Sequence, residues 1–399
     1  QSSLFVPFSC KKRTSCPSCD AKRSILSSSR LIEELLPHVA YRQWVLVIPK
    51  RLRYFVNRNH SLAGEISRLL AASLGRFYRD QAAKSSASAL LPEVAQPAQI
   101  HVIQRFGAKV NLHVHTHAVV SDVVIALNGK GMLVFAPITQ IAPEQLQRLT
   151  ESLRHKILKR FSRLGHIPEA TAQEMLSWPH SGFSLNATVK IEPQDREGLE
   201  RLLSYCLRPA ISVKRLRYWP EKDLVSYYIP KENLSVEWPV VEFLKRFSAI
   251  IPPPRVNLVR YGGALGPRSL LRRLVSGAAC RKVSSAELTG GWRMPSPLDG
   301  LLSQTKDLVR KAALDAWARC LGRIFEACPI VCTSCNMVML PVAAITESYE
   351  LTRLLKHLGL PHEFPITKPP RSPPQTSIGE DSQINPLADA FCGIDEPAE

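Results

Sequence analysis

The stretch Asn111 to Asp122, NLHVHTHAVVSD, places His113, His115 and His117 at a spacing of two. Successive side chains of a β-strand point to opposite faces, so a strand here puts all three imidazoles on one face. The opposite face is then the core-facing one and consists of Leu112, Val114, Thr116, Ala118 and Val120. Imidazole is the commonest protein ligand for divalent metals, so the pattern favours a metal site over a histidine-rich edge strand.

The upstream segment 98–106, AQIHVIQRF, also predicts a strand. Gly107 to Lys109 is short enough to turn it back onto the histidine strand as a hairpin. His101 and Gln104 are then further candidate ligands, and the choice between them is left open.

Charge narrows the range of partners. The chain of 399 residues carries 52 Lys and Arg against 34 Asp and Glu, a formal charge of +18. This excess predicts a polyanionic partner such as nucleic acid, with an anionic membrane surface as the alternative. The sequence shows no secretory signal and no apolar run long enough to span a membrane. We therefore expect a soluble intracellular protein whose ten cysteines are reduced or bound to zinc.

The amino-terminal segment FSCKKRTSCPSCDAKR contains Cys10, Cys16 and Cys19. The spacing of Cys16 and Cys19 is that of a zinc knuckle, but a structural zinc site needs four ligands. We expect the remaining ligand upstream of Gln1. Neighbouring lysines and arginines suit contact with a phosphate backbone or form a solvated face.

Periodicity predicts an α+β fold. The segment 41–56, YRQWVLVIPKRLRYFV, opens with an apolar run that is broken at Pro49 and predicts a first strand. Helical spacing of apolar residues predicts helices over about 61–83, 145–165 and 195–207. The helix over 145–165 is basic on its outer face. Strand, helix and hairpin alternate, which excludes an all-α or all-β chain.

The helix over 195–207, DREGLERLLSYCL, has one conspicuous tyrosine. Asp195 can cap the helix, Pro209 stops it, and an apolar stripe is formed by Leu199, Leu202, Leu203 and Cys206. Tyr205 lies off this stripe, on the flank of Arg201 and Arg208. A phenol beside two guanidiniums can hold and attack a phosphate, although a structural tyrosine is the simpler interpretation of the helix alone.

The segment 243–286 has no acidic residue, and its basic residues include Arg260, Arg268, Arg272 and Arg273. This composition predicts a surface that contacts DNA phosphates, and its Pro and Gly residues favour loops over a long helix.

A helix is expected over about 301–325, followed by a second candidate zinc cluster of Cys328, Cys332 and Cys335. The Pro- and Ser-rich tail 366–399 predicts disorder.

Taken in order, these stretches resemble the HUH-superfamily transposases of rolling-circle insertion sequences, close to the common-region elements. The matching stretches run over about 5–340 and include FSCKKRTSCPSCDAKR, YRQWVLVIPKRLRYF, IQRFGAKVNLHVHTHAVVSD, GLERLLSYCLRPAIS and EFLKRFSAIIPPPRVNLVRYGGALGP. The resemblance implies a partial zinc-binding domain over 1–28 and a catalytic domain over 40–215, with a central antiparallel sheet flanked by helices. A basic DNA-binding extension over 216–300 and a carboxy-terminal helix with its cysteine cluster over 301–345 follow.

The resemblance also assigns roles. His115 and His117 match the signature pair that binds Mg²⁺ or Mn²⁺, with His113 as the additional histidine, and Tyr205 matches the nucleophile. Arg201 stands where many relatives carry a second tyrosine, which indicates the single-tyrosine branch. The chain departs from the family pattern at Thr116, Val123 and Gly262.

The implied reaction is nicking and rejoining of single-stranded DNA through a 5′-phosphotyrosine, in the bacterial cytoplasm at the nucleoid. Two alternatives stay open. A DNA-binding protein without catalysis explains the charge and the cysteines, and a metal-dependent nuclease that uses water explains the histidines without a covalent adduct.

Overall fold

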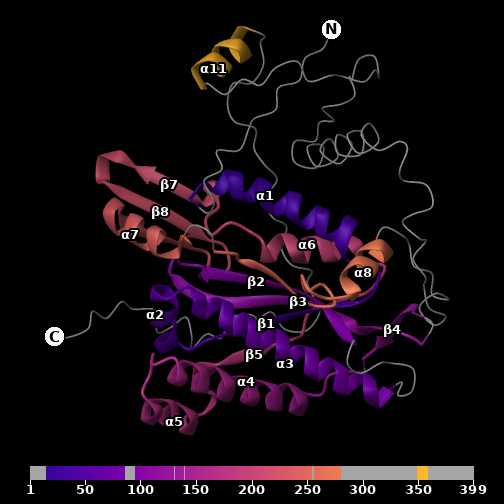
Figure 1. Cartoon of the computed structure of the whole chain (residues 1–399). Coiled ribbons are helices and arrows are strands. Elements are labelled where there is room, and N and C mark those ends of the chain that lie inside the picture. The colour runs from indigo at the N-terminus through magenta and orange to yellow at the C-terminus, as the bar shows by residue number, and fades with distance from the viewer. Residues whose placement is uncertain are drawn as a thin grey trace, which may run out of the picture.

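An antiparallel sheet with the strand order β10-β2-β3-β1-β5 forms the centre of the protein in the computed structural model (Figure 1). Two short strands extend it, β4 beside β3 and β6 beside β1. The strands are β1 (Tyr41–Val47), β2 (Gln96–Phe106), β3 (Leu112–Leu127), β4 (Leu133–Pro137), β5 (Ser184–Asn186), β6 (Lys190–Ile191) and β10 (Val259–Gly263). The predicted α+β class with a central antiparallel sheet is confirmed.

The structure describes residues 15–85, 95–129, 131–138, 140–253, 256–279 and 348–357. Several predictions lie outside these residues: Cys10, the helix over about 301–325, the cluster of Cys328, Cys332 and Cys335, and the tail 366–399. Within the described part, no helix is long and apolar enough to cross a membrane.

The predicted hairpin is formed by β2 and β3, with the turn at residues 107–111. Antiparallel pairing places Gln104 opposite His115 and Val102 opposite His117. On the other side of β3, strand β1 pairs Val47 with His115 and Val45 with His117. Because directly opposite residues share a face, the three central strands present one continuous histidine-bearing face.

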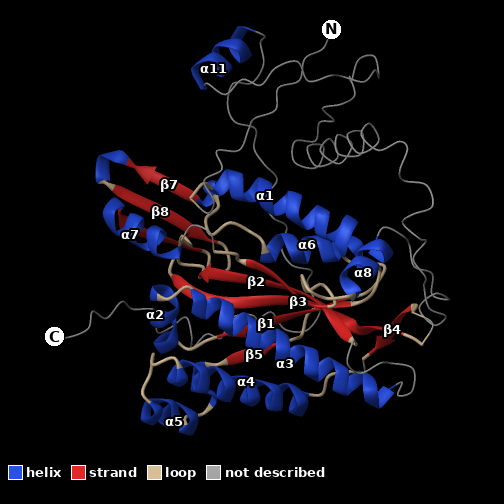
Figure 2. Cartoon of the chain, in the orientation of Figure 1, coloured by secondary structure: helices blue, strands red, loops and turns tan. Residues whose placement is uncertain are grey.

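The opposite face of the sheet is covered by α3 (Ser61–Ser85) and α4 (Pro143–Arg163), with α2 (Lys50–Arg58) and α5 (Glu169–Ser177) at its margin (Figure 2). Val114, Ala118 and Val120 of β3 pack into this core, as the alternation predicts. The buried stripe of α4 consists of Leu149, Leu153, Ile157 and Phe161. The two long helices run antiparallel, since Arg160 pairs with Glu65 and Lys156 bonds Ser73.

The histidine-bearing face is covered by α1 (Pro17–Arg30), α6 (Arg196–Cys206) and α8 (Leu271–Ala279), with a π-helical turn, η1 (Leu31–Leu35), between α1 and β1 (Figure 1). Two polar contacts join α1 to α6. The Ser24 hydroxyl donates to the Ser204 carbonyl at 3.1 Å, and the Ser204 hydroxyl donates to Ser28 at 3.0 Å. The helix that follows the cysteine knuckle therefore packs directly on the helix that carries Tyr205.

A second, three-stranded sheet is formed by β7 (Leu216–Trp219), β8 (Leu224–Ile229) and β9 (Leu234–Pro239), backed by α7 (Val240–Ile250). Its core includes Val110 from the β2–β3 turn, so this sheet lies at the histidine end of β3. Short helical turns occur at η2 (His180–Gly182), η3 (Val213–Arg215) and η4 (Pro220–Lys222), and α11 (Ser348–His357) is the last described element.

Two expectations about local structure need correction. The strand that begins at Tyr41 ends at Val47, because Pro49 provides a helix entry and Leu52 and Val56 have helical spacing in α2. The basic segment expected to form loops instead contains α7, β10 and α8. Strand β10 pairs with β2, so residues beyond 215 complete the main sheet.

Candidate active site

The imidazole rings of His113, His115 and His117 follow one another along β3 on a single face. Their ring centroids are 5.0 Å apart for the first two and 4.9 Å apart for the last two. His113 and His117 are buried, and His115 is partly exposed. The shared face that the spacing predicts is therefore present, under the helices α1 and α6.

Hydrogen bonds orient two of these rings. Nδ1 of His115 lies 2.9 Å from the carbonyl oxygen of His113, which can only accept, so Nδ1 carries the proton and Nε2 keeps its lone pair. Nδ1 of His117 lies 2.8 Å from Nε2 of the Gln43 side-chain amide, which donates to it in this orientation, and the buried Nε2 of His117 has no hydrogen-bond partner within the described residues. The flipped amide, with Oε1 of Gln43 at Nδ1, makes Nδ1 the donor and gives Nε2 of His117 the form that binds metal.

Burial also keeps the histidines uncharged. Desolvation lowers the pKa of His115 to about 4, and the positive charges of Arg208 and Arg53 act in the same direction. Desolvation, followed by the neighbouring His115, holds the pKa of His117 well below its ordinary value. Both rings are therefore neutral near pH 7, the state that a metal ligand requires.

The three imidazoles do not form a ready-made three-ligand site. Within the described residues, no group of three His, Cys, Asp or Glu side chains could hold a metal ion. The strand geometry explains this, because residues four positions apart are separated by roughly 13 Å along a strand. Adjacent histidines can share an ion, whereas His113 and His117 are too far apart to do so together with His115.

Gln104 completes the polar side of this face from β2. Its Nε2 donates to the carbonyl of Cys206 at 2.6 Å, while its buried Oε1 has no partner within the described residues. The register places Gln104 directly opposite His115. His101, the other candidate from this strand, pairs with Ala118 and so lies on the opposite face, where it bonds Gln99. The expectation for His101 is therefore wrong, since its ring cannot reach the histidine face.

Tyr205 lies against the histidines. The Asp195 side chain caps α6 by accepting from Gly198 N at 2.7 Å, and the predicted apolar stripe of the helix is buried. The Tyr205 ring is only partly buried, and its centroid is 5.8 Å from that of His117 in an edge-to-face arrangement. Helix and strand, far apart in sequence, thus bring the phenol to the histidine pair.

The two arginines predicted beside Tyr205 differ in their surroundings. The Arg208 guanidinium lies over the Tyr205 ring at 4.6 Å and near Phe106 at 5.4 Å, and its buried Nε has no hydrogen-bond partner among the described residues. Arg201 instead pairs with Asp195 and Glu197 of its own helix, at 3.8 and 3.7 Å. Arg208 is therefore the better placed of the two to meet a phosphate.

Sequence reasoning missed Gln43 and Arg53. Gln43 is buried on β1 and orients His117. Arg53 is buried on α2, where its Nε donates to the Ile48 carbonyl, and its charge lowers the pKa of His113 and His115. A polar residue inside the apolar run YRQWVLV was a signal for Gln43. Arg53 gave no signal while its segment was interpreted as strand.

The four predicted DNA-contacting arginines beyond residue 255 divide into two kinds. Arg268 and Arg273 are exposed. Arg272 donates to the Leu265 carbonyl and stacks on Tyr261 at 5.0 Å. Arg260 lies opposite His101 on the face away from the histidines, with its Nε buried. Only the exposed pair has guanidinium groups directed to solvent.

Of the three predicted zinc ligands, the structure describes Cys16 and Cys19. Cys16 precedes the first turn of α1 and Cys19 lies within that turn, and both are partly exposed. The start of α1 therefore carries the knuckle, with Pro17 between the two thiols as the first helical residue.

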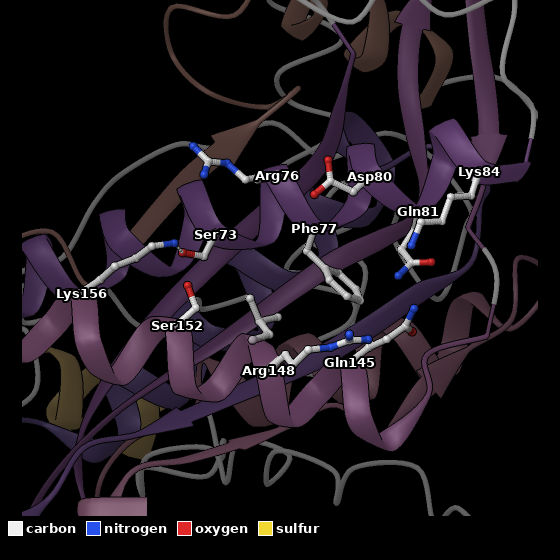
Figure 3. A pocket seen from close by; sticks show the side chains of 11 residues that line it. Ser73, Arg76, Phe77, Asp80, Gln81, Lys84, Gln145, Arg148, Ser152 and Lys156 are labelled. Carbon is white, nitrogen blue, oxygen red and sulfur yellow. Dashed lines mark hydrogen bonds between the residues drawn. The ribbon is translucent and has the colours of Figure 1, made fainter. Parts of the chain in front are cut away.

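The described part of the chain contains a hollow on each side of the sheet. One of about 250 Å³ adjoins the candidate site and is lined by α1, β2 and the end of α6, with Arg23, Gln104, Phe106, Cys206 and Arg208 among its residues. The other, of about 310 Å³, lies between α3 and α4 on the far side of the sheet (Figure 3). It holds none of the predicted catalytic residues.

Two family models match the chain. A model described as "Putative transposase" matches residues 99–270, which include the histidine strand and Tyr205. A second, the IS91 transposase zinc-binding domain, matches residues 1–48, which include Cys10, Cys16 and Cys19. The chain belongs to the IS91-type transposases. As a transposase it acts on DNA, and its amino-terminal segment is a zinc-binding domain.

Searches of curated proteins and of solved structures give no match. For this transposase, the assignment of individual residues therefore rests on the geometry described above.

Proposed function

We propose that this transposase nicks and rejoins single-stranded DNA, with Tyr205 as the nucleophile and a divalent ion on His115 and His117 as the Lewis acid. The observation that carries the proposal is the 5.8 Å separation of the Tyr205 and His117 rings. A packing tyrosine has no need of a neutral, hydrogen-bonded histidine pair at its edge. This arrangement supports the proposal over DNA binding without catalysis.

The residues fit a divalent ion. His115 offers Nε2, and His117 does so when the Gln43 amide presents its oxygen to Nδ1. We propose the amide oxygen of Gln104 as the third ligand, because it is buried without a hydrogen-bond partner among the described residues and oxygen suits Mg²⁺ and Mn²⁺. When bound, the ion supplies Lewis-acid polarisation of the scissile phosphate.

The protein's own residues orient the reacting groups. Asp195 and the contacts between α1 and α6 fix the helix that presents the Tyr205 hydroxyl. The Arg208 guanidinium, stacked on the phenol ring and without a carboxylate partner among the described residues, is placed to receive the phosphate. Buried Arg53 adds positive potential at the histidines, which favours an anionic substrate.

The reaction is a transesterification. The Tyr205 oxygen attacks phosphorus, the bond from phosphorus to the 3′ oxygen breaks, and the proton lost from the phenol is balanced by a proton gained at the 3′ oxygen. The products are a 5′-phosphotyrosine and a free 3′-hydroxyl. The reverse attack by another 3′-hydroxyl joins strands without a nucleotide cofactor, because the phosphodiester linkage is conserved.

Labelled single-stranded oligonucleotides with Mn²⁺, separated on a denaturing gel, test the proposal. The wild-type protein should form a covalent adduct that maps to the peptide containing Tyr205, and Tyr205→Phe should abolish it while DNA binding is retained. Tyr227→Phe and Tyr228→Phe are matched controls, since Tyr227 is buried in the small core and Tyr228 bonds Asn233.

The alternatives correspond to distinct results. Cleavage without an adduct would indicate a nuclease that uses water, and binding without cleavage would indicate a protein that has lost catalysis. An adduct that persists in Tyr205→Phe would assign the nucleophile elsewhere.

A further inference from the structure

The groove between α3 and α4 is the hollow on the face of the sheet remote from the histidines. Its lining includes four cations: Arg76 and Lys84 from α3, and Arg148 and Lys156 from α4. Among its lining residues, all in the described part of the chain, Asp80 alone is acidic. The groove is therefore a concentrated positive feature with no role in the proposed nicking reaction.

The cations extend along the groove. The pair on α3 and the pair on α4 line facing sides of the groove. Figure 3 shows Lys156 reaching across to Ser73, and Arg148 lying beside Gln145. Within each helix, the two cations are roughly 12 Å apart at a rise of about 1.5 Å per residue. A ligand that contacts all four must carry several negative charges spread along its length.

These four cations outnumber the single carboxylate among the groove's lining residues, Asp80. Within the described residues, Arg76, Lys84, Arg148 and Lys156 form no ion pair. By contrast, two other arginines of α4 do: Arg160 pairs with Glu65, and Arg154 pairs with Glu151. The ammonium of Lys156 donates at 3.0 Å to the Ser73 hydroxyl, which is uncharged. Burial, followed by the positive charge of Arg76, lowers the pKa of Lys156. A bound anion would relieve this repulsion.

We propose that the α3–α4 groove binds the phosphodiester backbone of a DNA segment, separately from the strand held at the histidine face. The hydroxyls of Ser73 and Ser152 and the amide of Gln145 line the groove and match the donors that proteins offer to phosphate oxygens. The sheet would then have one DNA segment on each face. This site rests on the transposase family's use of DNA and does not depend on Tyr205 chemistry.

Phosphate contacts carry no base information, so the binding at this groove is independent of sequence. Arg76 and Arg148 are the residues to change, because both are exposed and can be replaced without disturbing the apolar core. Lys214→Glu with Lys222→Glu is the matched control, since both lysines are exposed, lie on η3 and η4, and alter the net charge equally.

The test is fluorescence anisotropy of the full chain with single-stranded and duplex oligonucleotides of unrelated sequence, over a range of salt. Arg76→Glu with Arg148→Glu should weaken binding at least about tenfold and flatten the plot of log affinity against log salt by roughly 1.4 for single strands or 1.8 for duplex. Arg76→Gln with Arg148→Gln should change both quantities in the same direction. Thermal unfolding should match the wild type.

The same losses of DNA affinity and of salt slope should occur when the groove substitutions are made in the His115→Ala, His117→Ala variant. This result would mean that the groove binds DNA independently of the histidine face. An unchanged salt slope, a loss confined to one sequence, or an equal loss in the lysine control would overturn the proposal. Adduct formation is measured separately. If the wild-type protein forms the adduct but the Arg76→Glu, Arg148→Glu variant binds DNA like the wild type, the groove proposal is rejected and the proposed function stands.

Discussion

The two faces of the central sheet are stabilised in opposite ways. Towards α3 and α4, the sheet presents Val114, Ala118 and Val120 to an apolar core, and the buried carboxylate of Asp122 on this face is paired with Arg42 and accepts from the Tyr78 hydroxyl. Towards α1 and α6, it buries the polar side chains of Gln43, Gln104, His113 and His117, and two buried atoms, Gln104 Oε1 and His117 Nε2, have no hydrogen-bond partner within the described residues. The apolar face contributes stability, and the histidine face retains polar groups at a cost in stability, as expected for a reactive site.

The largest expected effect is a difference in catalytic activity between histidine variants on the two faces. His115→Ala with His117→Ala should reduce cleavage and adduct formation by about 10³-fold, because the proposed ion loses both nitrogen ligands. DNA affinity should change little, since the cationic surfaces supply it. His101→Gln is the control, because His101 is a buried histidine of the same sheet on the other face. Equal losses in the two variants would mean that the faces do not differ in this respect.

The second effect separates them by stability. Leu153 of α4 is fully buried, and Leu153→Ala should lower the free energy of unfolding by about 3 kcal/mol in urea titration. Gln104→Leu should cost less, because the loss of the hydrogen bond to the Cys206 carbonyl is offset by removal of a buried oxygen that has no partner in the described structure. The same variant should weaken binding of Mn²⁺. A larger loss of stability in Gln104→Leu would contradict the division of roles.

A smaller effect tests how α1 supports the histidine face. Ser24→Ala removes the hydroxyl that donates to Ser204, next to Tyr205, and should lower the free energy of unfolding by about 1 kcal/mol. Ser27→Ala, on the same helix, should change it by less than about 0.5 kcal/mol. If both variants unfold like the wild type, the contact between α1 and α6 contributes no measurable stability.

The smallest effect concerns two adjacent arginines of α8. Arg273→Ala should flatten the salt dependence of single-strand binding by about 0.7, as expected for one phosphate contact. Arg272→Ala should leave the slope unchanged, because its guanidinium is held by Leu265 and Tyr261. Equal slopes for Arg273→Ala and the wild type would show that this arginine only faces solvent.

Much of this protein follows from local pattern. The alternation in NLHVHTHAVVSD determined the histidine face, because side-chain direction along a strand is a local property. The helical stripe of residues 196–206, the Asp195 cap and the off-stripe position of Tyr205 were equally readable, since they depend on spacing within one element. The cysteine knuckle and the basic composition indicated zinc and nucleic acid in the same way.

Tertiary structure decided what those residues meet. Strand register placed Gln104 at the histidines and His101 behind them, although both belong to one strand. Chain packing brought Arg208 over Tyr205, left Arg201 with its own helix, and buried Arg53 beside the histidines. It also placed the α3–α4 groove on the opposite face from the histidines. These outcomes depend on contacts between residues far apart in the chain, and local periodicity carries no information about such contacts.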